Sequence, residues 1–129
     1  MIRITWIKLV LSICTIIISF VVVAQTYPER PITIIVPFTP GGVSDITARP
    51  LAASMSSNIG QPIVIENKGG AGGAIGMTAA AKAKPDGYTL VMALPSMITI
   101  PISDRISSRP STFQLNQFKP ISRLTADPT

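Results

Sequence analysis

Residues 32–49 read ITIIVPFTPGGVSDITAR and contain a short apolar run, a turn and the start of an amphipathic segment. Ile32 to Val36 is almost wholly apolar and β-branched, which is typical of a strand buried on both faces of a parallel sheet. Two prolines and a glycine pair over Pro37 to Gly42 end that strand. Apolar residues at three- and four-residue spacing then predict a helix from Val43 to Ile59. Because Pro50 lies inside it, we expect a kink there or a helix that begins later.

The alternation of strand, loop and helix continues along the chain. Ile63 to Glu66 is a second short strand, the glycine-rich sequence GGAGG follows, and an alanine-rich stretch predicts a helix from about Ala74 to Ala83. Tyr88 to Ala93 has the pattern of a third strand. This order predicts an α/β fold with a parallel βαβαβ core. After the third strand the pattern weakens, and we expect a short helix from Met97 to Ile106 and an extended segment from Phe118 to Leu124.

The loops after the three strands are where an open α/β sheet binds ligands. Gly41 and Gly42 stand directly before a helix, where unpaired N–H groups and the positive end of the helix dipole favour a carboxylate or phosphate. The tight turn alone explains the same glycines equally well, and capping of the helix explains Asp45. Glu66 is interpreted as an acceptor that braces the glycine-rich loop, with an exposed acid as the alternative. Ser96 offers a hydroxyl to a ligand or to the next segment.

Glycines between a strand and a helix also raise the question of a nucleotide site. Gly70, Gly72 and Gly76 give G-x-G-x-x-x-G instead of G-x-G-x-x-G, and no G-K-[ST] follows as in a P-loop. The third strand ends in Met92 and Ala93, where a dinucleotide site needs an acid for the ribose hydroxyls. Close packing of a helix on a strand explains these glycines better. The sequence therefore predicts no cofactor.

The composition excludes several classes of function. The 129 residues include no histidine and one cysteine, so a site that needs an imidazole, an internal disulfide or a cysteine cluster for zinc is not available. Eleven Lys and Arg against six Asp and Glu give a net charge of +5. The basic residues are scattered, so no nucleic-acid partner is predicted. No carboxylate has a partner base at recognisable spacing, which argues against an enzyme.

Residues 1–24 have the pattern of a secretory signal peptide. Two basic residues precede an apolar stretch from Leu9 to Val23, and Val22 and Ala24 suit the −3 and −1 positions of a cleavage site. We therefore expect export and a mature chain of residues 25–129. An uncleaved membrane anchor is the alternative, although the run is shorter than the ~20 residues that span a bilayer. Cys14 is interpreted as part of the removed segment and not as a lipoprotein cysteine.

Three stretches together resemble the opening of a known receptor family. They are YPERPITIIVPFTPGGVSDITAR at 27–49, GQPIVIENKGGAGGAIG at 60–76 and AKAKPDGYTLVMA at 81–93. In this order and spacing they are similar to the substrate receptors of tripartite tricarboxylate transporters, the Bug family, and the similarity continues through FKPISRLTADP at 118–128. It implies an exported receptor of the type II periplasmic binding-protein fold. Residues 25–129 would then be an incomplete first lobe, because the family's chain continues into a second lobe.

The resemblance also implies a site for a small carboxylate, formed by all three loops. The first loop would bind the carboxylate under an aromatic ring and set its selectivity, the second would border the pocket, and the third would supply a hydroxyl. The residues carried over are Phe38, Thr39, Gly41, Gly42, Asp45, Gly73, Ala74 and Ser96. Three positions depart from the family: Ala74 stands where many members have Asn, and Met97 and Ile100 stand where a His and an Asn are common.

The function that the resemblance implies is transport. A periplasmic receptor of this kind binds a small organic acid and delivers it to the membrane permease subunits of a tripartite tricarboxylate transporter, without a metal or cofactor. A degenerate remnant that binds nothing is the first alternative, since the chain covers only the opening of the family's usual length. An exported enzyme is a more distant one.

Overall fold

Three parallel strands form the centre of the structure, which is a computed structural model that describes residues 26–124. The predicted signal peptide lies outside these described residues. The elements in chain order are β1 (Ile32–Val36), α2 (Val43–Ile59), β2 (Ile63–Asn67), the 3₁₀ helix η1 (Ala71–Gly73), α3 (Ala74–Ala81), β3 (Thr89–Val91), α4 (Ser96–Ile106) and the 3₁₀ helix η2 (Leu115–Gln117). Within this range, no helix has both the length and the hydropathy that crossing a bilayer requires.

The sheet has the strand order β2-β1-β3, with both pairs parallel. β1 is therefore the central strand, and its residues Ile34, Ile35 and Val36 are at most 4% exposed. This confirms the prediction of a strand buried on both faces and of an α/β fold with a parallel βαβαβ core. The register pairs Val36 with Asn67, the last residue of β2.

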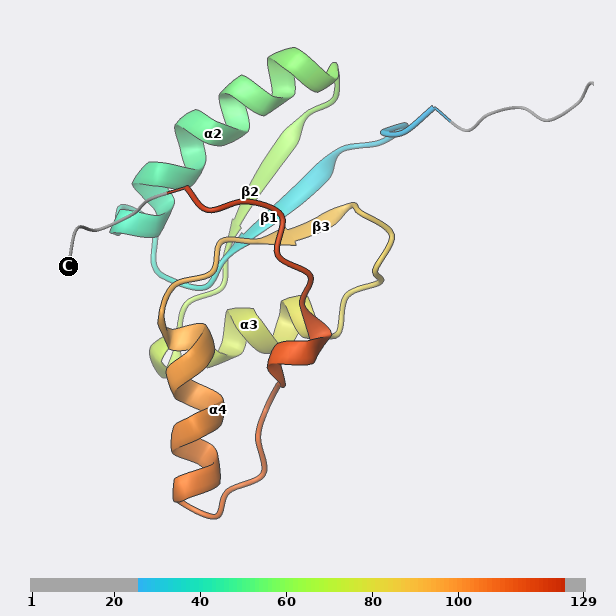
Figure 1. Cartoon of the computed structure of the whole chain (residues 1–129). Coiled ribbons are helices and arrows are strands. Elements are labelled where there is room, and N and C mark those ends of the chain that lie inside the picture. The colour runs from blue at the N-terminus through green and yellow to red at the C-terminus, as the bar shows by residue number, and fades with distance from the viewer. Residues whose placement is uncertain (1–25, 125–129) are drawn as a thin grey trace, which may run out of the picture.

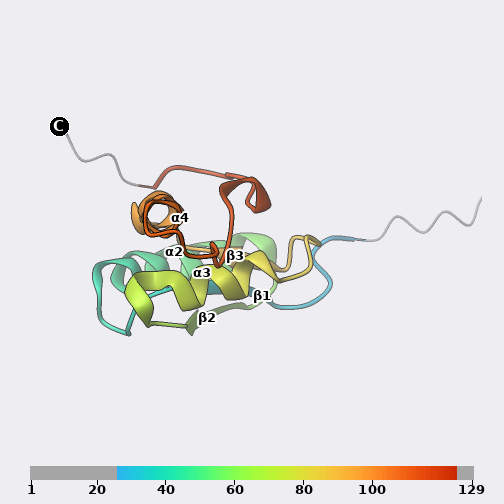
Figure 2. The same cartoon turned by 90° about the horizontal axis from the view of Figure 1, so that it is seen from below.

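The helices cover the sheet from two sides (Figure 1). On one face, Ile34 and Val36 of β1 pack with Ala48 and Ala52 of α2 to form the buried core. Small alanines at these positions let the helix approach the sheet closely. On the other side, α3 packs against β1 and β3, and its Met77 is fully buried. α4 packs on α3 and η1 and stands to one side of the sheet, as the view from below shows (Figure 2).

Some sequence predictions need correction at the ends of elements. α2 runs without interruption through Pro50, so the expectation of a later helix start was wrong. α3 ends at Ala81 and not at Ala83, and β3 is limited to Thr89–Val91. The ladder between β1 and β3 covers three residue pairs, from Thr33–Thr89 to Ile35–Val91. The segment from Phe118 to Leu124 was expected to be extended, and Phe118 has an extended backbone, although no strand forms there.

Candidate functional site

The loops that follow the three strands lie at the same end of the sheet, where the strands have their carboxyl ends (Figure 1). Because the strands are parallel, their carboxyl ends point the same way, and the chain leaves each of them to start α2, α3 or α4. None of these three helices has a side-chain hydrogen bond at its N-cap. At the starts of α3 and α4 the N–H groups donate to backbone carbonyls instead, from Ala74 to Ala71 and from Met97 and Ile98 to Leu94 and Pro95. In α2 the described bonds begin with Ile46, which donates to the Gly42 carbonyl, so α2 has the open helix start.

Gly73, in the second loop, lies close to residues of both the first and the third loop. A Cβ atom at this position would lie 3.2 Å from Phe38 Cζ and 3.3 Å from Ser96 Oγ, so both side chains lie close to Gly73. Its φ of +102° is a conformation that residues with side chains rarely adopt. Three of the predicted site residues, one from each loop, are thus near one another.

The remaining predicted positions lie around this contact. Thr39 is exposed in the first loop, and a Cβ at Gly69 in the second loop would lie 3.2 Å from the Thr39 backbone nitrogen. Gly41 and Gly42 precede the first turn of α2, and Ala74 is the first residue of α3. The second loop therefore approaches the first at two positions, Gly69 and Gly73.

The glycine-rich segment is held close to β1 by Gly76. A Cβ atom there would lie 2.6 Å from Pro37 Cα and 2.8 Å from the Lys68 carbonyl oxygen, distances that no side chain accommodates. This geometry supports close helix–strand packing as the role of that glycine. α3 therefore packs directly against the end of β1, where the first loop begins.

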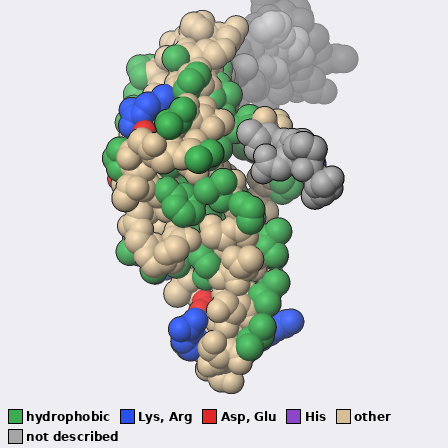
Figure 3. All heavy atoms as spheres, turned by 90° about the vertical axis from the view of Figure 1, so that its left-hand side faces the viewer, with side chains coloured by type: hydrophobic (Ala, Val, Ile, Leu, Met, Phe, Trp, Pro, Cys, Tyr) green, Lys and Arg blue, Asp and Glu red, His purple; other side chains and the backbone are tan. Residues whose placement is uncertain are grey.

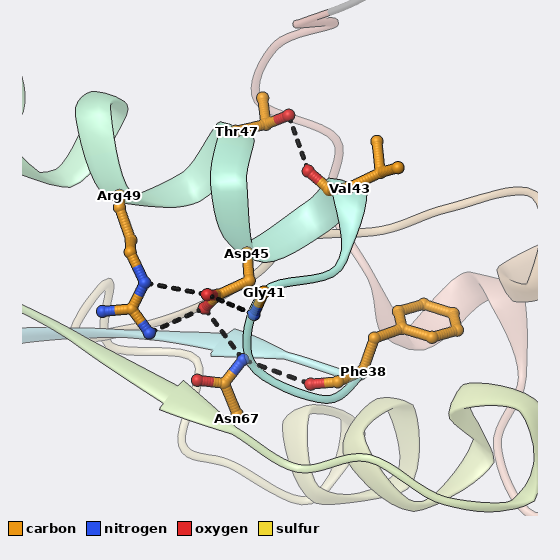
Figure 4. A network of polar contacts seen from close by, with 7 residues as sticks. All are labelled: Phe38, Gly41, Val43, Asp45, Thr47, Arg49 and Asn67. Atoms are coloured by element: carbon orange, nitrogen blue, oxygen red, sulfur yellow. Dashed lines mark hydrogen bonds and ion pairs between the residues drawn. The ribbon is translucent and has the colours of Figure 1, made fainter.

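Asp45 is the centre of a polar network that fixes the first loop (Figure 4). Its carboxylate accepts a hydrogen bond of 2.9 Å from the Gly41 N–H and two from the Arg49 guanidinium, at 2.8 and 3.0 Å. Asn67 Nδ2 donates to the same carboxylate at 3.0 Å and to the Phe38 carbonyl oxygen at 3.1 Å. Both carboxylate oxygens are therefore occupied by partners within the protein.

This network keeps the Asp45 carboxylate ionised. The hydrogen bonds from Arg49, and then those from Gly41 and Asn67, lower the pKa of Asp45 from its ordinary value of 3.8 to about 2. Asp45 in turn raises the pKa of Arg49. Asp45 is only 2% exposed, and its carboxylate bonds the N–H of Gly41, ahead of the N-cap, instead of capping the helix itself. The first-turn N–H groups of α2 remain available to another acceptor.

The Phe38 ring points away from the Asp45 network, toward the side where Gly73 and Ser96 lie (Figure 4). Ser96 Oγ is buried and has no hydrogen-bond partner among the described residues. A buried hydroxyl without a partner costs free energy, so its presence at the start of α4, close to Gly73, is a feature to explain. A ligand oxygen that accepts its hydrogen bond would explain it.

The face of the molecule on this side carries few charged side chains at its centre. Hydrophobic and uncharged polar atoms occupy the middle of the face, whereas Lys and Arg lie toward its upper and lower ends (Figure 3). An anion at the centre would therefore be held by hydroxyl and backbone N–H donors and not by a salt bridge. Among residues 26–124, no three His, Cys, Asp or Glu residues come together as a metal site.

A groove of about 890 Å³ lies beside this contact. Ser44 and Met97 line it near the starts of α2 and α4, and the chain from Gln117 to Leu124 lines its far side. None of the eight predicted site residues lines this groove. We therefore place the candidate site at the contact between Phe38, Gly73 and Ser96, where the buried hydroxyl lies.

Sequence reasoning missed three residues near the site. Arg49 and Asn67 complete the Asp45 network, and Ser44 Oγ is a second buried hydroxyl without a partner among the described residues. Asn67 is the residue after Glu66, which was expected to brace the glycine-rich loop. Glu66 itself is exposed and forms a surface ion pair of 2.8 Å with Lys68. The position of Asn67 at the end of a strand adjacent to β1 was the signal available.

Comparison with known proteins identifies relatives over most of the chain. Protein BugT of Bordetella pertussis is 49% identical over 88 residues, which are 68% of this chain and 26% of that protein. A UPF0065 protein of the same organism is 40% identical over 106 residues, or 82% of this chain and 32% of its own length. The chain thus spans about a quarter to a third of these curated relatives.

Two solved structures resemble this fold. One, described as a periplasmic transporter, has 48% identity and a TM-score of 0.59 over 67% of this chain and 28% of its own. Another, a protein of R. palustris solved with adipate, has 42% identity and a TM-score of 0.54 over 55% of this chain and 24% of its own. The model of the tripartite tricarboxylate transporter family receptors matches residues 47–129. The chain belongs to this receptor family.

Proposed function

We propose that this chain binds one carboxylate of a small organic acid at the contact between Phe38, Gly73 and Ser96. The observation that carries the proposal is the buried Ser96 hydroxyl, which has no partner among residues 26–124 and lies beside Gly73 and Phe38. A carboxylate, which accepts several hydrogen bonds and donates none, suits such a hydroxyl and the uncapped start of α2. The R. palustris relative solved with adipate supports this ligand class.

The residues divide into those that touch the ligand and those that shape the loop. In this proposal the Ser96 hydroxyl and the N–H groups at the start of α2 donate to the carboxylate. The Phe38 ring covers the apolar carbon chain of the acid. Gly42 leaves the start of α2 open, because only the Thr39 carbonyl oxygen lies near its Cβ position, at 3.4 Å.

Asp45 is a positioning residue in this proposal and does not contact the ligand. Its two oxygens already accept hydrogen bonds from Gly41, Arg49 and Asn67. A free carboxylate facing the ligand would repel it, whereas a carboxylate paired with Arg49 does not. The contribution of Asp45 to selectivity is then indirect, through the shape of the first loop.

The wider function follows from the family. We propose that residues 1–24 direct export, that residues 25–129 are the opening part of the first lobe of a periplasmic receptor, and that the receptor delivers its acid to membrane permease subunits. The description of the family as receptors of a tripartite transporter and the description of one solved relative as periplasmic support this assignment. Binding without catalysis is the role that this family assignment favours.

A thermal-shift titration of purified residues 25–129 with adipate tests the proposal. We expect adipate to raise the melting temperature, as any ligand of the native state does, while the neutral diamide of the same chain length has no effect. Gly42→Val, which places a branched side chain at the start of α2, should abolish the shift. Gly42→Ala is the control, because its Cβ meets only an ordinary contact. A cooperative melt that adipate leaves unchanged would favour the non-binding remnant.

A further inference from the structure

Arg49 supplies the positive charge of the Asp45 network. Its Nε and Nη2 atoms donate to the two oxygens of the Asp45 carboxylate, at 2.8 and 3.0 Å. A guanidinium that bonds a carboxylate at two points is held in one orientation. The Gly41 N–H and the Asn67 amide, which also donate to this carboxylate, are uncharged. Among the partners of Asp45 that the structure describes, Arg49 alone therefore compensates its charge.

The Asp45 carboxylate lies at the start of α2, which is the open helix start of the candidate site. Asp45 is in the first turn of the helix, and it accepts a hydrogen bond from Gly41, the residue before the N-cap Gly42. The positive end of a helix dipole attracts an anion, and a negative charge already present in the first turn offsets that attraction. Without compensation, Asp45 would therefore oppose a carboxylate that binds at the start of α2.

The Arg49 guanidinium is placed to act on Asp45 and not on a ligand. It lies on the opposite side of Asp45 from the Phe38 ring, which covers the acid in the proposed function (Figure 4). The Asp45 side chain is buried, whereas more than half of the Arg49 side chain is exposed. The pair thus has its negative partner inside the fold, close to the first loop, and its positive partner at the surface.

From this geometry we propose that Arg49 is a positioning residue that allows the first loop to accept an anion, because it neutralises Asp45. The inference rests on the proposed function, since it concerns the same carboxylate site. With Arg49 in place the pair has no net charge, and the dipole of α2 favours an acid. Without Arg49 the Asp45 carboxylate would remain ionised near neutral pH, because the bonds from Gly41 and Asn67 still stabilise its charged form.

Calorimetric titration of adipate into variants of residues 25–129 near neutral pH tests the proposal. Arg49→Met removes the charge but keeps most of the side-chain length, and we expect it to weaken adipate binding by about threefold or more. In the double variant Asp45→Asn/Arg49→Met the pair is again without net charge, so the affinity should return to within about twofold of the wild type. Arg30→Met is the matched control, because Arg30 pairs with Asp86 at 2.9 Å, ahead of β1 and β3.

The dependence on salt separates a charge effect from a structural one. At about 1 M salt the screening length falls to about 3 Å, so the difference in adipate affinity between Arg49→Met and the wild type should largely disappear. A loss caused by a loosened loop would persist in high salt. This comparison needs only the single variant, so it decides between the two roles even where the double variant does not fold.

Several results would overturn the inference. If Arg49 only braces the loop, the double variant binds adipate no better than Arg49→Met, and high salt restores nothing. Equal affinity in Arg49→Met and the wild type, or an equal loss in Arg30→Met, would also exclude the proposed role. In all these cases the wild type still binds adipate and the proposed function stands. A wild type that binds no adipate would refute the proposed function, and this inference with it.

Discussion

The Asn67 side chain donates a 3.0 Å hydrogen bond to the buried carboxylate of Asp45, so the last residue of β2 supports the first turn of α2. The same amide nitrogen donates to the Phe38 carbonyl oxygen at 3.1 Å. Asn67 therefore connects both ends of the first loop, Phe38 two residues after β1 and Asp45 in the first turn of α2. The loop is held from a neighbouring strand as well as by its own turn.

Replacing Asn67 by Ala should loosen this loop. The substitution removes two hydrogen bonds, one of them to a charged acceptor, and we expect a loss of about 1–3 kcal/mol in the free energy of unfolding, measured with urea. Asn58→Ala is the control, because Asn58 lies exposed on α2 and bonds only the Ser54 carbonyl oxygen. Its effect should be within about 0.5 kcal/mol. Equal losses in both variants would show that Asn67 does not brace the loop.

The Asp45 network also predicts how acid affects stability. The pKa of Asp45 is about 2 in the folded chain, against an ordinary value of 3.8. Because the folded value is the lower one, the ionised carboxylate stabilises the fold above about pH 4, and this contribution is lost as the pH falls toward 2. We expect the wild type to lose stability across this window more steeply than Asp45→Asn, which is already less stable at neutral pH. Parallel curves of melting temperature against pH would refute this.

Replacing Gly76 by Ala has two effects on the stability of the fold, and they have opposite signs. Alanine in place of glycine inside an exposed helix stabilises it by about 1 kcal/mol. At Gly76 the added Cβ would meet Pro37 Cα at 2.6 Å, so we expect Gly76→Ala instead to destabilise the fold by about 1–3 kcal/mol. Thermal or urea unfolding measures the sign directly. A gain in stability would mean that α3 does not need its close approach to β1.

The sequence was most informative where a single local pattern decided the structure. The apolar run at Ile32–Val36 and the spacing over Val43–Ile59 predicted β1 and α2 with their observed bounds. Of the two alternatives at Pro50, a kink or a later helix start, the later start was wrong, because packing of Ala48 and Ala52 on the sheet outweighs the lost hydrogen bond. β3 was predicted too long, since its length depends on its ladder with β1, which no local pattern reveals.

The candidate site could likewise be predicted from the sequence only in part. Glycines before a helix indicated the first loop, and the family resemblance supplied Phe38, Gly73 and Ser96, which the structure brings into contact. Asn67 could not be predicted from its own neighbourhood, because its role depends on the parallel register that sets it opposite Val36. The unpartnered state of Ser96 Oγ is likewise a property of the folded chain.

Calorimetric titration of adipate into Ser96→Ala tests whether the Ser96 hydroxyl binds the ligand. The substitution removes a buried hydroxyl that has no partner in the described structure, so the melting temperature without ligand should stay the same or rise. Ser103→Ala, a change elsewhere on α4, is the matched control. We expect Ser96→Ala to weaken adipate binding by about tenfold or more, which corresponds to the loss of one hydrogen bond to a charged acceptor, while Ser103→Ala binds adipate like the wild type. Equal adipate affinity in Ser96→Ala and the wild type would contradict it.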